Sequence, residues 1–433
     1  MRFLGVGETC DLGALYLSLK AEGHEVRVFV SEPEAGGTLA GLVERSADWR
    51  ADLDWLRAAP DQGVILFESV SEGFGALQDS LRRDGLHVIG GSAYGDRLEN
   101  DRAYAQDVLA ELGFPRGHIW DFQAPADALA FIGGRPARYV LKQSGADHAA
   151  SDTYIGGLPD GSDVAAILRT KPAGSGLILM EFVDGIEMGV GAYFDGERFL
   201  SPACLDWEHK RFFAGELGEL TGEMGTVVTY DRTDRFFALT LAKMESRLRE
   251  NGYVGYINLN TIVNEDGIWP LEFTCRFGYP GFAILDPLQE TPWGEIFQRI
   301  VRRSGGRFET RLGFSVGVVL TTPPFPYTRQ QVAEPVGLPV LFDDTAEPRH
   351  YHLGEVGLDQ AGQLVTSGLY GWTMVVTGTG ATIAAAKHDA YAHVEQVFIP
   401  NVRYRLDIGD RLIAGDFARL EQLGFLALGN GRA

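Results

Sequence analysis

The first hundred residues alternate short apolar runs with segments of helical periodicity, and this alternation constrains the fold more than any other feature. Parallel strands need a crossover between them, usually a helix, so the pattern predicts a parallel sheet with helices on both faces. The predicted strands are Arg2–Val6, Glu25–Val30, Gly63–Phe67 and Leu86–Ile89, with helices over Leu12–Glu22 and around Phe74–Arg83. Gly5, Gly7 and Gly13 lack the GxGxxG spacing, which argues against a dinucleotide site.

The chain has 433 residues, which is too long for a single hydrophobic core and predicts several domains. We place an N-terminal α/β domain over 1–100, a central domain over 101–305 and a C-terminal α+β domain over 306–433. Strands at Tyr139–Lys142 and Leu177–Phe182 predict a mobile small lobe over about 115–185 within the central domain.

Further elements are predicted on both sides of the second boundary. Met188–Phe194 and Arg198–Leu205 form a predicted hairpin, and the glycine-rich segment Asp206–Thr226 is predicted to be a functional loop. A helix is predicted over Arg235–Asn251. In the C-terminal domain, apolar residues three or four apart predict a helix that buries Ile383, Ala386, Ala390 and Val394.

Composition limits the possible partners. A net charge of −21 repels a phosphate backbone, so non-specific nucleic-acid binding is not expected. No apolar run approaches the ~20 residues that span a bilayer, and the first residues read as a strand rather than a signal peptide, so a cytoplasmic location without membrane contact is expected. Cys10, Cys204 and Cys275 lack zinc-site spacing, which favours reduced thiols. A monomer or homodimer is expected.

Two apolar strands, Val254–Val263 and Ile268–Phe273, flank the turn residues Asn264–Gly267 and predict a hairpin. Such a hairpin places the amide of Asn260 opposite the carboxylate of Glu272, with Arg276 just beyond. Oxygen ligands beside a guanidinium suit Mg²⁺ and the phosphates that it carries. The alternative is a surface hairpin with ordinary polar residues.

A second candidate site is the segment Met180–Glu187, which leaves a strand, turns at Asp-Gly and presents a carboxylate after the turn. The backbone groups of Glu181 and Val183 could pair with an adenine edge, while Glu187 accepts hydrogen bonds from ribose hydroxyls. The alternative is a strand that ends in a turn with a solvated glutamate.

Basic residues at two places suit phosphate. Lys142 ends an apolar strand, where an ammonium group needs a partner such as phosphate. His209, Lys210 and Arg211 form a compact cluster beside a glycine-rich segment, a combination that suits phosphate capture and closure. The alternatives are a lysine in water and a solvated loop.

Taken in order, these segments resemble the ATP-grasp ligases, and among them most closely the glycinamide ribonucleotide synthetase (phosphoribosylamine–glycine ligase) family. The resemblance covers essentially the whole chain and includes Tyr404–Arg411, which matches that family's closing R-x-D-I-G-x-R pattern. It implies an α/β ATP-grasp fold, with an N-terminal parallel α/β lobe, an ATP-grasp core and a C-terminal α+β lobe.

The resemblance also implies residue roles, with ATP and Mg²⁺ as cofactors. Arg102 and Lys142 would contact ATP phosphates, Glu181 and Val183 the adenine, and Glu187 the ribose. Glu272 would bridge Mg²⁺, Asn260 would replace a lost ligand, and Thr274 stands where the family has an amide ligand. Lys210 and His209 would act on phosphate, and Arg276 would orient the carboxylate substrate.

The chain departs from the family in functional segments. Glu8–Asp11 stands where the family has G-R-E-H, and Gly145–Ser151 where it has the loop G-L-A-A-G-K-G. N-T-G-G-M-G has become Leu220–Gly225, and D-P-E has become Tyr279–Gly281. Because positive groups that would hold a ribose phosphate are missing, phosphoribosylamine is not expected to be the preferred amine.

The sequence therefore predicts an ATP-dependent ligase that joins a small-molecule carboxylate, glycine or another small amino acid, to an amine through an acyl phosphate. A changed amine substrate is the first interpretation, and a genuine phosphoribosylamine–glycine ligase of purine biosynthesis is the alternative. A non-catalytic nucleotide-binding paralogue is the third.

Overall fold

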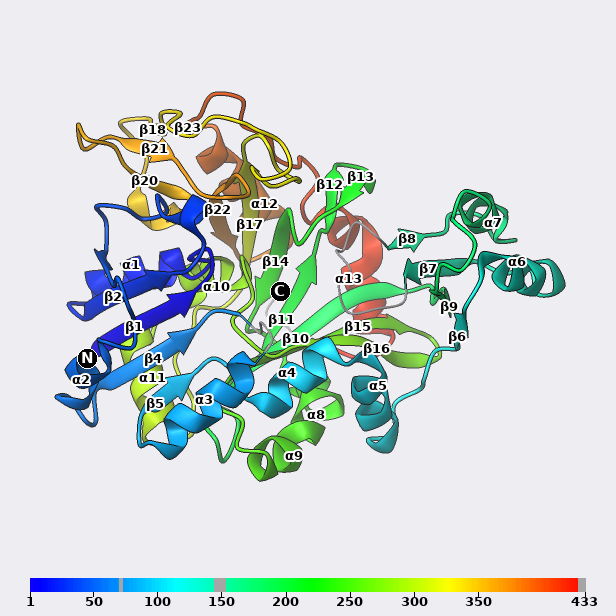
Figure 1. Ribbon diagram of the computed structural model, residues 1–433, viewed down its shortest axis with the longest axis horizontal. Coiled ribbons are helices and arrows are strands. Elements are labelled where there is room, and N and C mark those ends of the chain that lie inside the picture. Colours follow the sequence, from blue (N-terminus) through cyan, green and yellow to red (C-terminus); the bar gives the residue numbers. More distant parts are fainter. Residues whose placement is uncertain (70–72, 144–152, 427–433) are drawn as a thin grey trace.

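The computed structural model describes residues 1–69, 73–143 and 153–426. The loop Gly145–Ser151 lies outside these residues. The N-terminal lobe contains the predicted parallel sheet, and the described strands follow the order β3-β2-β1-β4-β5 (Figure 1). The strands are β1 (Arg2–Gly7), β2 (Glu25–Val30), β3 (Glu44–Arg45), β4 (Gly63–Phe67) and β5 (His87–Ile89). The helices are α1 (Gly13–Ala21), α2 (Leu53–Arg57), α3 (Phe74–Arg83) and α4 (Ala93–Asn100).

The small lobe projects from the body of the molecule (Figure 1). After α5 (Arg102–Glu111), its strands pair in the order β6-β9-β7-β8. Its elements are β6 (Ile119–Phe122), α6 (Pro125–Gly134), β7 (Tyr139–Gln143), β8 (Tyr154–Ile155), α7 (Ser162–Leu168) and β9 (Leu177–Glu181). Tyr139, Leu141, Leu177 and Leu179 form its core with one face of each helix, so the lobe has a hydrophobic core of its own.

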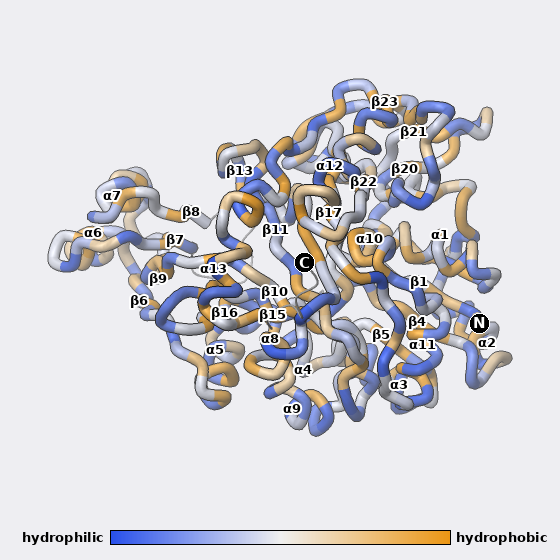
Figure 2. Tube along the Cα trace, turned by 180° about the vertical axis from the view of Figure 1, so that it is seen from behind, coloured by the Kyte–Doolittle hydropathy of each residue, from blue (hydrophilic) through white to orange (hydrophobic). Residues whose placement is uncertain are grey.

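A large antiparallel sheet forms the centre of the molecule, with the described strands in the order β16-β15-β10-β11-β14-β17-β22-β19. They are β10 (Ile186–Phe194), β11 (Cys204–Glu208), β14 (Gly225–Thr229), β15 (Gly255–Asn264), β16 (Gly267–Thr274), β17 (Phe314–Thr321), β19 (Tyr351–Leu353) and β22 (Trp372–Gly380). Figure 2 shows apolar residues along the inner strands. Because β17, β19 and β22 come from the C-terminal segment, the core sheet continues across the expected boundary at 305.

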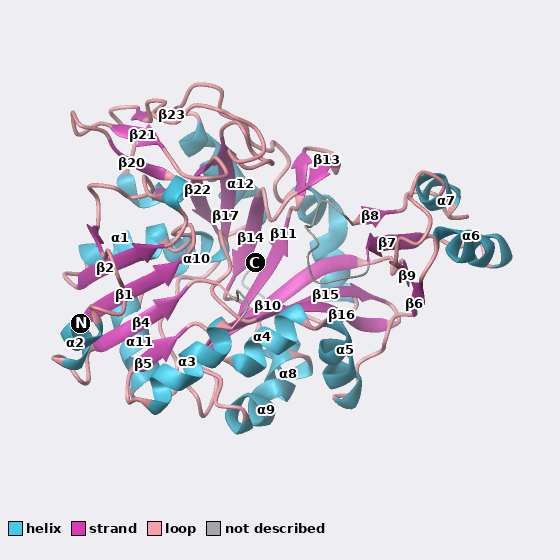
Figure 3. Ribbon diagram, in the orientation of Figure 1, coloured by secondary structure: helices cyan, strands magenta, loops and turns pink. Residues whose placement is uncertain are grey.

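Helices and short strands complete the structure. The helices are α8 (Asp234–Leu239), α9 (Glu245–Glu250), α10 (Gly281–Leu285), α11 (Trp293–Val301), α12 (Ile383–Val394) and α13 (Phe417–Gln422). The short strands are β12 (Arg211–Phe213), β13 (Leu217–Leu220), β18 (Leu341–Phe342), β20 (Val356–Leu358), β21 (Leu364–Thr366) and β23 (Val397–Phe398). Much of the segment between β17 and β22 is loop (Figure 3). The helix expected from the spacing of Ile383, Ala386, Ala390 and Val394 is confirmed, and all four residues are buried.

Three predictions of local structure are wrong. Asp206–Thr226 is not one loop, because β11 is paired on both sides within the core sheet and β12 pairs with β13. The second strand of the hairpin begins at Cys204 rather than Arg198; Pro202 has no N–H for a strand ladder. The helix over Arg235–Asn251 is broken at Thr240, whose backbone φ of −123° and ψ of −99° are not helical.

Candidate functional site

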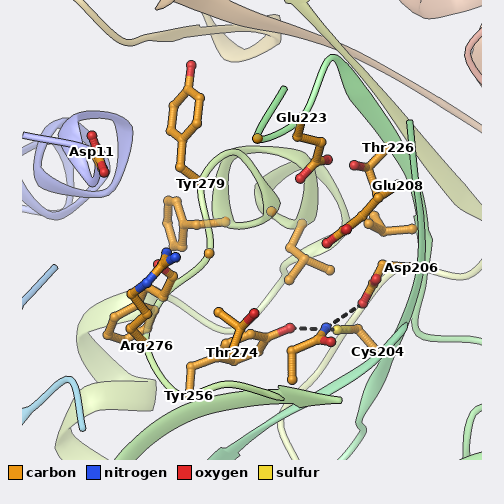
Figure 4. Close-up of a pocket in the computed structure, with 18 of the residues that line it drawn as sticks. Asp11, Cys204, Asp206, Glu208, Glu223, Thr226, Tyr256, Thr274, Arg276 and Tyr279 are labelled. Atoms are coloured by element: carbon orange, nitrogen blue, oxygen red, sulfur yellow. Dashed lines mark hydrogen bonds between the residues drawn. The ribbon is translucent and has the colours of Figure 1, made fainter. Parts of the chain in front are cut away.

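A cavity of about 520 Å³ lies where the core sheet faces the N-terminal lobe (Figure 4). Asp11 and Glu68 line it from the N-terminal lobe, and residues of β11, β14, β15 and β16 line it from the core sheet. The segment from Arg276 to Leu285 and the aromatic ring of Trp372 enclose it further. The cavity therefore draws its lining from all three parts of the chain.

The predicted hairpin is confirmed, because Asn260 of β15 pairs with Glu272 of β16. Thr274, Glu272 and Arg276 line the cavity. The side-chain amide of Asn260 donates to Glu187 Oε1 at 2.7 Å, and its oxygen accepts from the Thr261 backbone N–H at 2.9 Å. The carboxylate of Glu272, which is 51% exposed, is thus the more available oxygen ligand of the pair.

Lys210 holds three carboxylates together. Its Nζ lies 3.0 Å from Glu187 Oε1, 3.1 Å from Glu208 Oε2 and 3.5 Å from Glu272 Oε1. Burial opposes the charge, but these carboxylates hold the pKa of Lys210 well above its usual range. In return, Lys210 lowers the pKa of Glu272, with smaller contributions from Arg102 and Lys142. The cluster joins β10, β11 and β16 at one point.

Two further cations face Glu272. Burial, together with the positive charge of nearby Arg102, lowers the pKa of Lys142 to about 8. Burial also lowers the pKa of Arg102, against the attraction of Glu272. Arg102 Nε is buried and has no hydrogen-bond partner within the described part of the chain. A buried donor without a partner is costly, so this corner of the site favours an anionic ligand.

Seven of the predicted site residues are not part of this cavity lining: Arg102, Lys142, Glu181, Val183, Glu187, His209 and Asn260. Glu181 lies at the end of β9, where its backbone N–H donates to the His118 carbonyl at 3.0 Å and its carboxylate contacts His118 Nδ1 at 2.7 Å. His209 is buried and accepts the Gly409 N–H at Nε2 over 3.1 Å. Burial, with Arg405 nearby, lowers the pKa of His209 to about 4, so the ring is neutral at pH 7.

Arg276 lies at one side of the cavity, on the segment that follows β16 (Figure 4). Its Nε contacts Glu99 Oε1 at 3.1 Å, and the other oxygen of Glu99 accepts the Cys275 N–H at 2.6 Å. Glu99 thereby fixes both the backbone and the guanidinium group. The position predicted for carboxylate binding is held rigidly by a helix of the N-terminal lobe, α4.

Sequence reasoning missed an acidic set on the opposite side. Asp206 and Glu208 line the cavity together with Cys204, because alternate residues of β11 face the same way. This period of two was available in the sequence, but the prediction of a loop from Asp206 concealed it. Glu223 also lines the cavity, just before β14.

The segment carrying Glu223 is anchored to the basic cluster by backbone hydrogen bonds. The Thr221 N–H donates to the Lys210 carbonyl, and the Met224 N–H donates to the His209 carbonyl, both at 2.8 Å. The backbone carbonyls of His209 and Lys210 therefore position this segment, and of the two side chains that of Lys210 lines the cavity. The sequence placed these residues near one another but did not show this pairing.

An aromatic pair also lines the cavity. The rings of Tyr279 and Trp372 stack with centroids 4.8 Å apart at 29°. The buried carboxylate of Glu355 accepts the N–H groups of Leu369, Tyr370, Gly371 and Trp372, which fixes the segment before β22. Burial raises the pKa of Glu355 to about 7. Sequence reasoning had no signal for Trp372, because it lies almost a hundred residues from Tyr279.

The fold is that of the ATP-grasp class of proteins. Residues 100–282 match the family model described as phosphoribosylglycinamide synthetase, ATP-grasp (A) domain. Within this class the chain is similar to phosphoribosylamine–glycine ligases. The ligase of Pseudomonas aeruginosa is 26% identical over 432 residues, which cover 96% of this chain and 99% of that protein.

Solved structures show the same fold. The phosphoribosylamine–glycine ligase of Thermotoga maritima matches with a TM-score of 0.69 and 22% identity, over 94% of this chain and 100% of that one. The biotin carboxylase domain of the 2-oxoglutarate carboxylase of Hydrogenobacter thermophilus, solved with MgADP, ADP and bicarbonate, matches with a TM-score of 0.62 and 12% identity. That match covers 93% of this chain and 91% of the other. In the part of the chain that the structure describes, no helix is long and apolar enough to cross a membrane.

Proposed function

We propose that the protein is an ATP-dependent carboxylate–amine ligase that uses Mg²⁺. The observation that carries this proposal is the convergence of Glu272, Lys142 and Arg102 beside Lys210. Glu272 offers an oxygen ligand for Mg²⁺, and the unpartnered Nε of Arg102 offers a donor for a phosphate oxygen. The residues present therefore fit a magnesium–nucleotide complex.

The chemistry follows from this arrangement. Bound Mg·ATP would supply a phosphoryl group that activates a carboxylate as an acyl phosphate, and an amine would then displace phosphate to leave an amide. Lys142 and Arg102 neutralise charge on phosphate, and Arg276 orients the carboxylate. Lys210 already contacts three carboxylates, so it holds Glu272 and Glu187 in position. Positioning and charge neutralisation dominate catalysis at such sites.

The names of the relatives support glycine and phosphoribosylamine as substrates more strongly than they support a changed amine. A different amine is a second candidate because one observation favours it. Of the described residues, six acidic side chains and two basic ones line the cavity, which is an unfavourable setting for a ribose phosphate. A cytoplasmic location is part of the proposal.

The test is ADP release from Mg·ATP with glycine and freshly prepared phosphoribosylamine, and with glycine and other amines. Glu272→Gln should abolish turnover and leave the fold intact, because it removes the negative charge that would attract Mg²⁺. A matched control is Glu309→Gln, which changes an exposed side chain outside the cavity. ADP release by Glu272→Gln near the wild-type rate would contradict the role of Glu272.

Nucleotide binding is tested separately by thermal unfolding. Mg·ATP at a hundred times its Kd should add about 2.7 kcal/mol to the free energy of unfolding. Stabilisation without turnover for any substrate pair would support a non-catalytic nucleotide-binding protein instead.

A further inference from the structure

Three carboxylates form one side of the cavity: Asp206, Glu208 and Glu223, here called the acidic wall. Figure 4 shows them directed into the cavity, opposite Arg276. Glu223 is only 5% exposed, and its Oε1 has no hydrogen-bond partner within residues 1–69, 73–143 and 153–426. A buried carboxylate oxygen without a partner is rare and calls for a specific explanation.

The protein itself supplies little positive charge to this wall. Glu208 contacts Lys210, but that ammonium group is shared with Glu187 and Glu272. Asp206 accepts one hydrogen bond, from Asn258 Nδ2 at 2.6 Å. Burial raises the pKa of Glu223, and the charges of Glu208 and Asp206 raise it further. A bound cation would relieve this repulsion.

Other polar groups around the cavity also lack partners among the described residues. They are the hydroxyl groups of Thr226 and Tyr279 and the indole N–H of Trp372. Tyr279 and Trp372 present aromatic rings beside the acidic wall. Carboxylates next to aromatic faces are suitable surroundings for an organic cation, because both attract positive charge.

Two other ligand classes fit less well. Within the described residues, no group of three or more His, Cys, Asp or Glu side chains is arranged to hold a metal ion. A phosphate would face the six acidic side chains of the lining. The motif N-T-G-G-M-G, which Leu220–Gly225 replaces, has glycine where this chain has Glu223. The carboxylate is therefore an addition specific to this site.

We infer that the acidic wall binds a protonated amino group of a substrate, while Arg276 on the opposite side holds a carboxylate. The inference rests on the proposed ligase function and adds the chemical class that the site selects. The amino group has two possible sources: the ammonium of an amino-acid substrate, or a second amino group on the amine that is acylated. Both present the same charge to Glu223.

The experiment compares wild type with Glu223→Gln, which keeps the shape of the side chain and removes its charge. Glu223→Gly, the residue of the related motif, is a second variant. Glu219→Gln is the matched control, because Glu219 lies on β13, outside the cavity lining. Each protein is first checked for an unchanged fold by circular dichroism and thermal melting.

Turnover is measured as kcat/KM for ADP release with two matched pairs. Comparing kcat/KM for glycine with that for acetate tests whether the site recognises the ammonium group of the acid. Comparing 1,4-diaminobutane with 1-aminobutane tests whether it recognises a second amino group on the amine that is acylated. In wild type the compound with the extra amino group should be preferred, and Glu223→Gln should reduce that preference by roughly tenfold or more, as expected for a lost charged hydrogen bond. The affected pair identifies the source. Equal preferences in Glu223→Gln, Glu219→Gln and wild type would overturn the inference.

A binding measurement separates this inference from the proposed function. Glycine, 1,4-diaminobutane and MgCl₂ are each titrated by calorimetry in the presence of Mg·ADP, where no turnover occurs. Weaker binding of glycine or the diamine to Glu223→Gln supports the acidic wall even if wild type shows no ligase activity. Unchanged binding of both, or a loss confined to Mg²⁺, contradicts it.

Discussion

Lys210 is the residue whose removal tests the site most directly. Lys210→Met keeps most of the side-chain volume and removes the only charge that contacts Glu187, Glu208 and Glu272 together among the described residues. The three carboxylates then repel one another without compensation. We expect the fold to survive with a clear loss of stability.

The magnitude follows from the distances and the exposure. One pair at 3.0 Å is attracted by about 5.5 kcal/mol at an effective dielectric constant of 20, and desolvation and repulsion among the carboxylates offset much of this attraction. Breaking a buried ion pair costs about 3–5 kcal/mol. The side chains of Glu187 and Glu272 are 41% and 51% exposed, so water screens the attraction between each of them and the Lys210 ammonium group. We therefore expect a loss of about 2–3 kcal/mol at pH 8.

The loss should depend on pH. Removing the ammonium group raises the folded-state pKa of the neighbouring carboxyl groups. When the pKa of a carboxyl group is higher in the folded protein than in the unfolded chain, ionisation of that group destabilises the fold. The free energy of unfolding then falls as pH rises from the unfolded-state pKa, near 4.3 for Glu, through the folded-state pKa. The deficit of Lys210→Met should thus be small at pH 5 and largest at pH 8.

The assay is urea unfolding at both pH values, with Lys20→Met as the control on an exposed helix surface. The control should stay within about 0.5 kcal/mol of wild type. Adding Glu187→Gln to Lys210→Met should recover part of the loss, because one of the repelling charges is removed. A free energy of unfolding equal to that of wild type at pH 8 would refute this account of the cluster.

Three further predictions concern the surroundings of the cavity. Gly189→Ala should lower the free energy of urea unfolding by about 1–3 kcal/mol, because a Cβ at this position would lie 2.0 Å from Asp206 Oδ1. The control Gly133→Ala should not destabilise the protein, because no atom lies within 4 Å of its added Cβ. Equal stabilities of the two variants would contradict the crowding at Gly189. Burial raises the pKa of Glu68 to about 8, so the free energy of unfolding should fall as pH rises from 5 to 7.5. Glu68→Gln should remove a slope of up to about 1.4 kcal/mol per pH unit from this dependence. Parallel curves of unfolding free energy against pH for wild type and variant would contradict the raised pKa. Arg276→Lys should lower kcat/KM for the carboxylate substrate by roughly tenfold or more although the charge is retained. The reason is that a point charge cannot contact both Glu99 and a carboxylate as a guanidinium group does. A kcat/KM equal to that of wild type would show that Arg276 does not bind the acid.

Local pattern was sufficient for much of the fold. The alternation in the first hundred residues fixed the parallel sheet, because a strand–helix repeat is a local signal with few solutions. The hairpin was predictable for a similar reason, since two apolar runs around a short turn pair with each other. Its pairing of Asn260 with Glu272 also depends on a shift of register between Asn260 and Thr261, which the turn alone does not set. Residues predicted from these segments, Glu272, Thr274 and Arg276, do line the cavity.

Only the tertiary structure brought distant charges together. The sequence predicted Lys210 as a cation available for phosphate. In the structure, the order of β10, β11 and β16 in the core sheet places three carboxylates around its ammonium group. Asp206, Glu223 and Trp372 belong to segments whose pairing is non-local, and no short-range period connects them. The N-terminal α/β alternation and the hairpin were therefore set by the sequence itself, whereas the charge balance of the cavity was decided by strand order, which depends on contacts between residues far apart along the chain.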